Sequence, residues 1–427
     1  MSKEKRRVPK LRFPGFTEDW EQCKLTDIAK TFIGLVTTMT ENYRDSGTLL
    51  IRNSDIKEGQ FIFSEKPIHL DEEFAEKNKT RRLQIGDVVT VHTGDIGTSA
   101  VIEEKEDGAI GFATINTRTD QRILNPYFLS TYFNTEKHKC YANSVSTGDG
   151  RSNYNIKDFN KLVISIPTLD EQERISLLIN NINTIITLHQ RKLNNLKLKK
   201  KALLQKLFPK NGERYPELRF SGFTDAWEQC KLGEIFEYLQ NNTLSRDSLN
   251  YRIPNIKNIH YGDILVKFNE ILDGSNKDIP YINPDLDLSK FSKSLLRDGD
   301  VIFSDTAEDD TVGKAIELQN VNAPFILSGL HTIPCRPLIP FGKGYLGNFF
   351  NSNSYRLQIR PLVQGIKVSS ISKSALKDTM IEYPKNLDEQ EKIGSLFQSI
   401  TKMITLHQRK LDHLQLQKKA LLQQMFV

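Results

Sequence analysis

The sequence of 427 residues contains two long internal repeats, which occur in the same order in each half. Residues 9–28 recur at 216–235 with 14 identities in 20 positions, and residues 169–208 recur at 387–426 with 25 identities in 40. The offset between copies is 207 residues in the first pair and 218 in the second. Matches of this length are too widely spaced for a solenoid and indicate a duplicated domain. The chain is therefore expected to fold as two similar halves.

The middle region of each half is predicted to be a mixed α/β domain of about 160 residues, large enough to bury its own core. Short runs rich in β-branched and aromatic residues, bounded by Gly, Asn and Asp, are typical of strands. Such runs lie at 86–92, 162–166 and 300–304, whereas 126–140 has the composition of a helix. The predicted fold class is α/β, with two similar domains.

The repeated segments 169–208 and 387–426 are predicted to be long helices. Thr168 and Glu171, like Asn386 and Glu389 in the second copy, have the spacing of a capping box at a helix start. Apolar residues then recur at alternating spacings of four and three, which is the pattern of a coiled coil. Single burial of each helix against a globular core is the alternative. The seam positions are Ile175, Ile179, Ile182, Ile186, His189, Leu193, Leu196, Lys200, Leu203 and Leu207, and Ile393, Phe397, Ile400, Ile404, His407, Leu411, Leu414, Lys418, Leu421 and Met425.

The chain order of domain, helix, linker, domain, helix favours pairing of the two helices with each other. An antiparallel pair would place a domain at each end and create an internal pseudo-two-fold axis. The seam spans 32 residue steps, or about 48 Å of helix. Duplex DNA has the same local symmetry, and two-fold proteins read half-sites about 34–36 Å apart or a multiple of this. Because the two middle regions differ in sequence, the predicted target is an asymmetric, two-part site.

Four polar residues interrupt the apolar seam: His189, Lys200, His407 and Lys418. Polar seam residues commonly fix helix register at some cost in stability. The alternative for the two lysines is that they lie at the edge of the seam and extend their ammonium groups into solvent.

Composition excludes some classes of protein. No apolar run approaches the roughly 18 residues of a membrane span, and the basic start at 1–10 is not followed by an apolar signal core. The expected compartment is the cytosol. The 59 Lys and Arg against 53 Asp and Glu leave a net charge of +6, which allows a polyanionic partner. The four cysteines are too scattered for a disulfide framework, and the equivalent Cys23 and Cys230 are expected to be half-buried packing residues.

Motifs for catalysis are absent from the sequence. It has no phosphate-binding Gly-x-x-x-x-Gly-Lys-Ser/Thr loop, no Asn/Asp-Pro-Pro-Tyr segment, no His-Glu-x-x-His and no paired Cys-x-x-Cys. One nuclease-like pattern is present, Asp95 followed by Glu103, Glu104 and Lys105, which can hold a divalent metal. The matching place in the second half, 317–319, lacks the lysine. A self-sufficient nuclease is thus a minor alternative.

The duplicated openings, with WEQCKL in both copies, and the duplicated helices, with LDEQE, ITLHQRKL and KKALLQ, resemble the specificity subunit of type I restriction-modification systems. The resemblance covers nearly the whole chain, including the order of variable and repeated regions. It implies a first target recognition domain at 1–167, a conserved helix at 168–208, a linker at 209–216, a second target recognition domain at 217–384 and a second conserved helix at 385–427.

The resemblance also implies a non-catalytic function and a set of partners. Each domain would read one half of a bipartite DNA site, and the helices would set the spacer and dock two modification subunits. Those subunits would bind S-adenosylmethionine and methylate adenine, and restriction subunits would add the ATP- and Mg-dependent nuclease. No cofactor or metal is expected on this chain. A function from another class, a coiled-coil scaffold that binds proteins and not DNA, is the alternative.

Candidate DNA contacts are polar side chains on segments that differ between the halves, because phosphates and base edges are met by such donors and acceptors. Two equivalent polar loops, 144–155 and 363–374, are the main candidates. The residues predicted in the first half are Arg52, Asn53, Thr93, Arg118, Thr147, Arg151, Ser152 and Asn153. Those in the second half are Arg252, Lys257, Ser304, His331, Gln364, Lys367 and Ser369.

The first predicted helix is more basic than the second, which keeps only Arg409, Lys410, Lys418 and Lys419 at the equivalent positions, with Asp412 opposing. Residues 191–206 include seven Lys and Arg and no acidic residue. This stretch can meet the DNA backbone or dock an acidic partner, and both interpretations remain open on the sequence.

Overall fold

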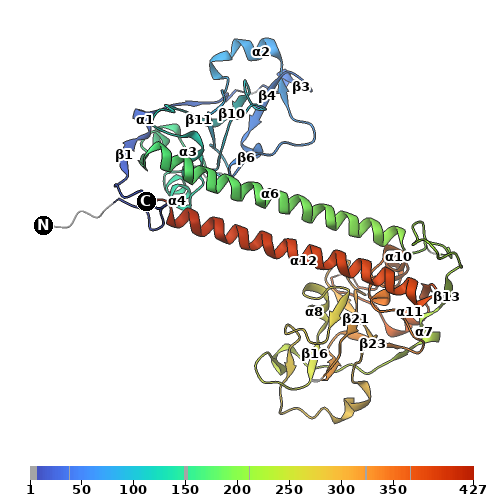
Figure 1. Ribbon diagram of the computed structural model, residues 1–427. Helices are drawn as coiled ribbons and strands as arrows, with labels where there is room; N and C mark the ends of the chain where they lie inside the picture. The colour runs from blue at the N-terminus through green and yellow to red at the C-terminus, as the bar shows by residue number, and fades with distance from the viewer. Residues whose placement is uncertain (1–6, 38, 149–151, 211, 323–324, 366) are drawn as a thin grey trace. The chain divides into compact units, whose positions relative to one another are not determined.

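The computed structural model describes residues 7–37, 39–148, 152–210, 212–322, 325–365 and 367–427. The chain divides into two compact units (Figure 1). Unit 1 contains Met1–Gln190 and Arg409–Val427, and unit 2 contains Arg191–Gln408. Two 38-residue helices, α6 (Leu169–Lys206) and α12 (Leu387–Gln424), contribute to both units.

Unit 1 is built from small sheets and short helices. Its helices are α1 (Leu25–Ile28), α2 (Glu72–Lys77), α3 (Pro126–Phe133), α4 (Glu136–Ser144) and α5 (Ile156–Phe159). Its strands are β1 (Glu21–Lys24), β2 (Ala29–Ile33), β3 (Tyr43–Arg44), β4 (Thr48–Arg52), β5 (Ile56–Lys57), β6 (Gln60–Phe61), β7 (His69–Leu70), β8 (Val88–Val91), β9 (Ser99–Val101), β10 (Ile110–Phe112), β11 (Thr114–Thr119) and β12 (Val163–Ile166). The two larger sheets have the orders β2-β11-β8-β9 and β10-β4-β7-β3.

Unit 2 repeats this plan with drifted lengths. Its helices are α7 (Leu232–Ile235), α8 (Tyr261–Val266), α9 (Tyr345–Phe349), α10 (Asn353–Ile359) and α11 (Lys373–Lys377). Its strands are β13 (Glu228–Lys231), β14 (Phe236–Tyr238), β15 (Leu249–Asn250), β16 (Lys257–Ile259), β17 (Ile271–Asp273), β18 (Tyr281–Ile282), β19 (Val301–Ser304), β20 (Thr306–Ala307), β21 (Ala315–Gln319), β22 (Ile326–Ser328), β23 (Thr332–Pro337), β24 (Ser369–Ser370) and β25 (Met380–Tyr383). The sheet β14-β23-β19-β21-β17 contains equivalents of β2, β11, β8 and β9. The predicted α/β fold class and strands are confirmed, and the helical segment predicted at 126–140 is divided between α3 and α4.

The repeated WEQCK segment pairs, in each domain, with the strand that precedes the long helix. Strand β1 pairs antiparallel with β12, and β13 pairs antiparallel with β25, so the opening of each repeat lies beside the strand that leads into α6 or α12. Cys23 faces Ile164, and Cys230 faces Ile381 at the equivalent position. Both cysteines are partly buried, which confirms the packing role predicted for them.

Each unit has a hydrophobic core that contains the start of one long helix and the end of the other. In unit 1, Ile175 from the start of α6 and Met425 after α12 belong to the same core. In unit 2, Phe397 from the start of α12 stacks on Phe208, which follows α6, with ring centroids 6.0 Å apart. Because a start meets an end in both units, α6 and α12 run antiparallel (Figure 1). The predicted helix pair is confirmed. Each compact unit contains one domain, the start of one long helix and the end of the other.

The heptad positions behave as a seam, since each of them is buried or partly buried. The two seam lysines have a role that the sequence did not indicate. Lys200 of α6 bonds Glu270 of the second domain, and Lys418 of α12 bonds Glu58 of the first. Each lysine therefore anchors the end of its helix to the domain of the other repeat.

The predicted capping-box glutamates are used differently from the expectation. Arg12 donates to both carboxylate oxygens of the buried Glu171, at 2.7 and 2.8 Å. Arg219 binds the buried Glu389 in the same way, at 2.7 and 2.9 Å. These glutamates connect the opening of each repeat to the first turn of its helix, so the reciprocal cap predicted for them is wrong. The Oδ1 of Asn386 accepts from the backbone N–H of Asp388, as a helix cap does.

Candidate nucleic-acid interface

The two polar loops predicted as equivalent form equivalent hairpins. In unit 1, Thr147 and Asn153 exchange backbone hydrogen bonds of 3.1 and 2.9 Å. In unit 2, Gln364 and Ser370 exchange backbone hydrogen bonds of 3.0 and 2.8 Å. The paired residues are six positions apart in both hairpins, so the two hairpins are closed at equivalent positions and carry different side chains.

The hairpin of unit 1 lies against the chain that leaves β8. Thr93 pairs with Asn153 through the backbone, and its hydroxyl donates to Asn153 Oδ1 at 2.8 Å. The side chain of Asn53 accepts from the His92 N–H and donates to the Ala113 carbonyl, which connects three neighbouring loops. Four of the predicted DNA-contact residues, Asn53, Thr93, Thr147 and Asn153, are thereby brought together, and Ser152 lies on the same hairpin.

The hairpin of unit 2 lies against the corresponding segment after β19. Thr306 pairs with Ser370, and Ala307 with Ser369, as the short sheet β20-β24. His331 approaches this segment, with its Nδ1 3.3 Å from Asp305 Oδ1 and 3.4 Å from the Thr306 hydroxyl. Predicted residues Gln364, Lys367 and Ser369 belong to the hairpin, and His331 lies beside it.

His331 has a strained backbone, with φ at +55°. Only glycine enters this left-handed region without a steric cost, and such residues cluster at functional sites. Ala113, one residue before β11, has φ at +49° and is the counterpart of His331, one residue before β23. The turn is thus a property of the duplicated fold, while the imidazole belongs to unit 2 alone.

Arg118 lies away from the hairpin. It is four residues along β11 from Thr114, which pairs with Val91 at the hairpin end of the sheet, a distance of about 13 Å. Its guanidinium forms two hydrogen bonds with Asp87, of 2.7 and 2.8 Å. Arg336 holds Asp300 in the same way in unit 2, at 2.7 and 2.9 Å. The duplication of this pair assigns Arg118 a structural role.

Three further predicted residues contact other groups within the fold. Ser304 is buried within β19 and donates to the Thr306 carbonyl. Lys257 is buried in β16 and donates to the carbonyls of Gly274 and Asn276. Arg52 forms a paired contact with Asp55 at the end of β4. The burial of Ser304 and Lys257 corrects their placement on a contact surface.

Two predicted residues remain. Arg252 is exposed on the turn after β15, outside the hairpin. Arg151 lies outside the described residues.

Sequence reasoning missed Thr306, Asp305 and Tyr261 in unit 2. Thr306 is the equivalent of Thr93 when the two copies are aligned on Asp87 and Asp300, so the repeat itself contained the signal. Ser304 was predicted two positions too early, at a strand position that points inward. The ring of Tyr261 contacts that of His331 edge to face at 5.2 Å, a long-range contact without a sequence signal.

The nuclease-like pattern does not assemble into a metal centre. Asp95 accepts from the Thr98 hydroxyl at 2.8 Å, and Glu103 accepts from the Tyr127 hydroxyl. Across the described part of the chain, no three or more His, Cys, Asp or Glu side chains gather as metal ligands. Within the same residues, no helix has the length and apolar character of a membrane span.

Comparison with known proteins gives one consistent result. Residues 17–198 match the family model described as type I restriction modification DNA specificity domain. The chain is 19% identical to the type I restriction enzyme MjaVIII specificity subunit and 24% identical to the putative MjaX specificity subunit, both from Methanocaldococcus jannaschii. These matches cover 96% and 95% of this chain, respectively, and 92% of each relative. The fold is similar to the crystal structure of the type I restriction-modification S subunit from M. genitalium, with a TM-score of 0.56, 12% identity, and coverage of 98% of this chain and 99% of that one.

Proposed function

We propose that this chain, which is similar to type I restriction-modification specificity subunits, has their function and that its two domains read the two halves of an asymmetric, bipartite DNA site. Unit 1 would read one half through the hairpin 147–153, and unit 2 the other half through the hairpin 364–370. The helices α6 and α12 would set the number of unspecified base pairs between the halves.

The observation that carries this proposal is the pair of equivalent hairpins with different side chains. Their frameworks are closed by the same backbone hydrogen bonds, so both can meet DNA in the same way. Unit 1 presents Thr147, Ser152 and Asn153, whereas unit 2 presents Gln364 and Lys367. Base edges are distinguished by donor and acceptor patterns, for which Asn, Gln and Lys are suited. Different side chains on one framework predict different half-sites.

Docking of two modification subunits on the long helices is the second part of the proposal. Three pairs of equivalent apolar residues on the helices are exposed: Ile185 and Met403, Leu188 and Leu406, and Leu198 and Leu416. Each unit carries one member of every pair, so each has the same set of three exposed positions. Exposed apolar residues on paired helices are suited to packing against a partner's helices. Two equivalent sets support two copies of the same subunit.

Chemistry is assigned to the partners. S-adenosylmethionine would be bound by the modification subunits, and ATP and Mg by the restriction subunits. This chain would contribute recognition and geometry, and a restriction complex would form when both kinds of subunit are bound. The cytosol, where the DNA is, would be its place of action.

Selection from a random duplex library tests half-site reading. The full-length chain, with and without modification subunits, is expected to enrich one asymmetric two-part motif. Gln364→Ala should relax the motif in one half, and Thr147→Ala in the other, because both residues are exposed on opposite members of the hairpin pair. Lys402→Ala, on the exposed side of α12, is the control and should leave both halves unchanged. Absence of any enriched motif would favour the protein-binding scaffold.

Removal of one heptad from each long helix tests spacer setting. Seven residues shorten the helix by about 10 Å, or roughly three base pairs of DNA. The two half-sites should stay the same while the spacer shortens or binding is lost. An unchanged spacer would contradict the measuring role of the helices.

A further inference from the structure

Unit 2 contains a cavity of about 440 Å³ between the end of α6 and the helix α10. Its lining includes five cationic side chains, Lys197, Lys200, Lys201, Arg356 and Arg360. Two carboxylates, Glu270 and Asp310, also line it. Glu270 is occupied by Lys200, which contacts both of its oxygens at 2.7 and 2.8 Å. The cavity therefore has a clear excess of positive charge.

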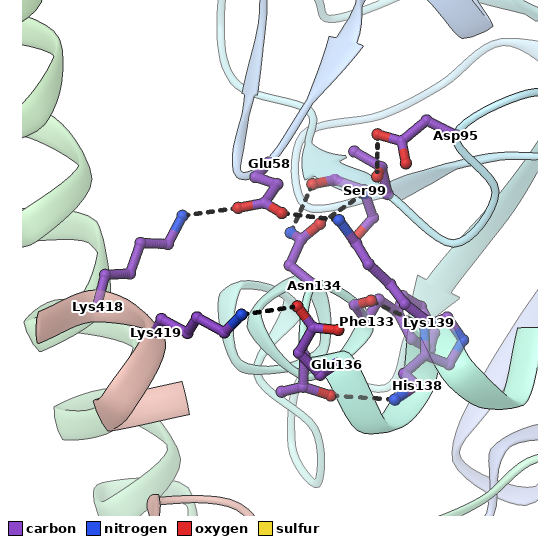
Figure 2. Close-up of polar contacts among 12 residues, drawn as sticks. Glu58, Asp95, Ser99, Phe133, Asn134, Glu136, His138, Lys139, Lys418 and Lys419 are labelled. Atoms are coloured by element: carbon purple, nitrogen blue, oxygen red, sulfur yellow. Dashed lines mark hydrogen bonds and ion pairs between the residues drawn. The ribbon is translucent and has the colours of Figure 1, made fainter. Parts of the chain in front are cut away.

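The equivalent place in unit 1 is closed and its charges are largely paired (Figure 2). It is lined by Lys418, Glu58 and Asn134 and has a volume of only about 10 Å³. Asn134 corresponds to Asn351 of the unit 2 cavity, because each bonds the neighbouring strand, at Ser99 and Ala315, through the same side-chain atoms. The two places can therefore be compared residue by residue.

Three substitutions between the repeats make the unit 2 cavity more basic. Lys197 stands where the second repeat has Gln415, and Arg360 stands where the first domain has Asn143. Asn353, the first residue of α10, stands where α4 begins with Glu136. Each change adds one positive charge or removes one negative charge.

Because position 353 is not acidic, Lys201 lacks the carboxylate that its counterpart in unit 1, Lys419, has beside it. In unit 1, Lys419 lies 3.8 Å from Glu136, and Glu58 accepts from both Lys418 and Lys139 (Figure 2). Among the described carboxylates of unit 2, none forms an ion pair with Lys197, Lys201 or Arg360. These three cations are available to an anionic ligand.

Arg356 connects this cavity to the hairpin surface of unit 2. Its guanidinium donates to the backbone carbonyls of Asp310 and Val312, which holds the loop between β20 and the cavity. Burial lowers the pKa of Arg356, Asp310 opposes this effect, and the nearby charge of Arg360 lowers it further. Asp310 lines the cavity and follows Thr306 by four residues, so it lies no more than about 14 Å along the chain from Thr306, which pairs with Ser370 of the hairpin.

We infer that this cavity binds phosphate groups of the DNA backbone next to the half-site of unit 2, and so gives the second domain a sequence-independent anchor that the first domain lacks. The inference rests on the proposed function, which places DNA on the hairpin 364–370. A duplex on that hairpin brings its backbone close to this cavity, because the short segment 306–310 connects the two. Lysine and arginine without carboxylate partners are the side chains that neutralise phosphates.

The salt dependence of DNA binding by the full-length chain tests the inference with a non-specific duplex. Each phosphate contact contributes about 0.9 to the slope of log affinity against log salt. Lys197→Gln is expected to make the fall of log affinity with log salt shallower by about 0.9. Asn353→Glu, which introduces the acidic residue of unit 1, should have a similar effect. Asp310→Asn removes a negative charge from the rim and should strengthen binding at low salt.

Lys199→Gln is the matched control. Lys199 lies on the same helix, carries the same charge and also corresponds to a glutamine, Gln417, but it does not line the cavity. Its slope should equal that of the unchanged chain. Equal slopes for Lys197→Gln and Lys199→Gln would overturn the inference.

The remaining outcomes separate the inference from the proposed function. If the unchanged chain shows no salt-dependent DNA binding, the proposed function fails and the inference fails with it. If DNA binding is steep in salt and none of the cavity variants alters it, only the inference fails. If Lys197→Gln and Asn353→Glu instead weaken assembly with the modification subunits and leave the slope unchanged, the cavity binds an acidic protein segment, and the inference is overturned.

Discussion

Lys200 of the first repeat's helix donates to both carboxylate oxygens of Glu270 in the second repeat's domain, at 2.7 and 2.8 Å. Their side chains are only 13% and 19% exposed. Lys418 and Glu58 form the equivalent contact in unit 1, at 3.0 Å. Because each pair joins a helix of one repeat to the domain of the other, the pairs contribute to how the two repeats are interlocked.

Removal of the carboxylate from this pair should destabilise unit 2. Glu270→Gln leaves the partly buried Lys200 without its partner, which is expected to cost about 2 kcal/mol of unfolding free energy. Urea unfolding, followed by circular dichroism, measures this cost. Glu73→Gln is the control, because its pair with Lys77 is 80% and 70% exposed and should contribute little to stability. Equal effects of both variants would contradict an anchoring role for Lys200.

The pairs that connect each repeat's opening to its helix should contribute equally in the two halves. Arg12→Ala and Arg219→Ala would each leave a buried glutamate, Glu171 or Glu389, without its cation. A loss of roughly 3 kcal/mol is expected for each variant. Thermal unfolding of both variants beside Arg44→Ala, which removes an exposed arginine, provides the comparison. A loss of unfolding free energy in only one of the two variants would contradict an equal contribution of the two pairs.

Truncation after residue 420 should destabilise unit 1, although the deleted residues belong to the second repeat. Met425 is buried in the core of unit 1, and Phe426 stacks on Phe128 with ring centroids 5.3 Å apart. Loss of these side chains removes part of that core, for which several kcal/mol are typical. Hydrogen exchange should accelerate around Phe128 and remain unchanged around Phe349 in unit 2. Faster exchange around Phe349 alone would contradict the exchange of helix ends between repeats.

Glu382 should make unit 2 less stable as pH rises. Burial raises the pKa of Glu382 to about 7, and only the Ser354 hydroxyl and a backbone N–H oppose this effect. The folded state therefore binds the proton more tightly than the unfolded state, whose pKa is near 4.5. Stability from this group is fully present below about pH 4.5 and is lost as pH rises toward about 7, by on the order of 3 kcal/mol.

Replacement of Glu382 by glutamine tests this pH dependence. Glu382→Gln should raise the melting temperature at pH 8 and flatten its dependence on pH between about 5 and 8. Glu308→Gln, at an exposed position in the same unit, should leave the dependence as it is in the unchanged chain. If Glu382→Gln also leaves it unchanged, then the pKa of Glu382 is not raised in the folded protein.

Much of the fold was predictable because the two repeats of the chain can be aligned with each other. The repeat at 9–28 and 216–235 predicted two equivalent domains, and the heptads predicted two helices in a seam. The polar loops 144–155 and 363–374 could be matched by their place before the last strand of each domain. The individual contact residues were harder to predict, because Arg118 and Lys257 have the same side-chain chemistry whether they face DNA or an internal partner. Their internal partners, Asp87 for Arg118 and the Gly274 carbonyl for Lys257, are visible only in the tertiary structure.

By itself, the sequence determined the duplication, the helix pair and the equivalence of the two hairpins, because these depend on local periodicity and on similarity within one chain. The tertiary structure decided which charges are paired. Lys200 and Lys418 occupy identical repeat positions, yet one lines an open basic cavity and the other a closed one. Two of the residues that make the first cavity more basic, Asn353 and Arg360, are more than 150 residues from Lys200 in the chain. A side chain's electrostatic environment is set by neighbours in space, and sequence spacing does not reveal them.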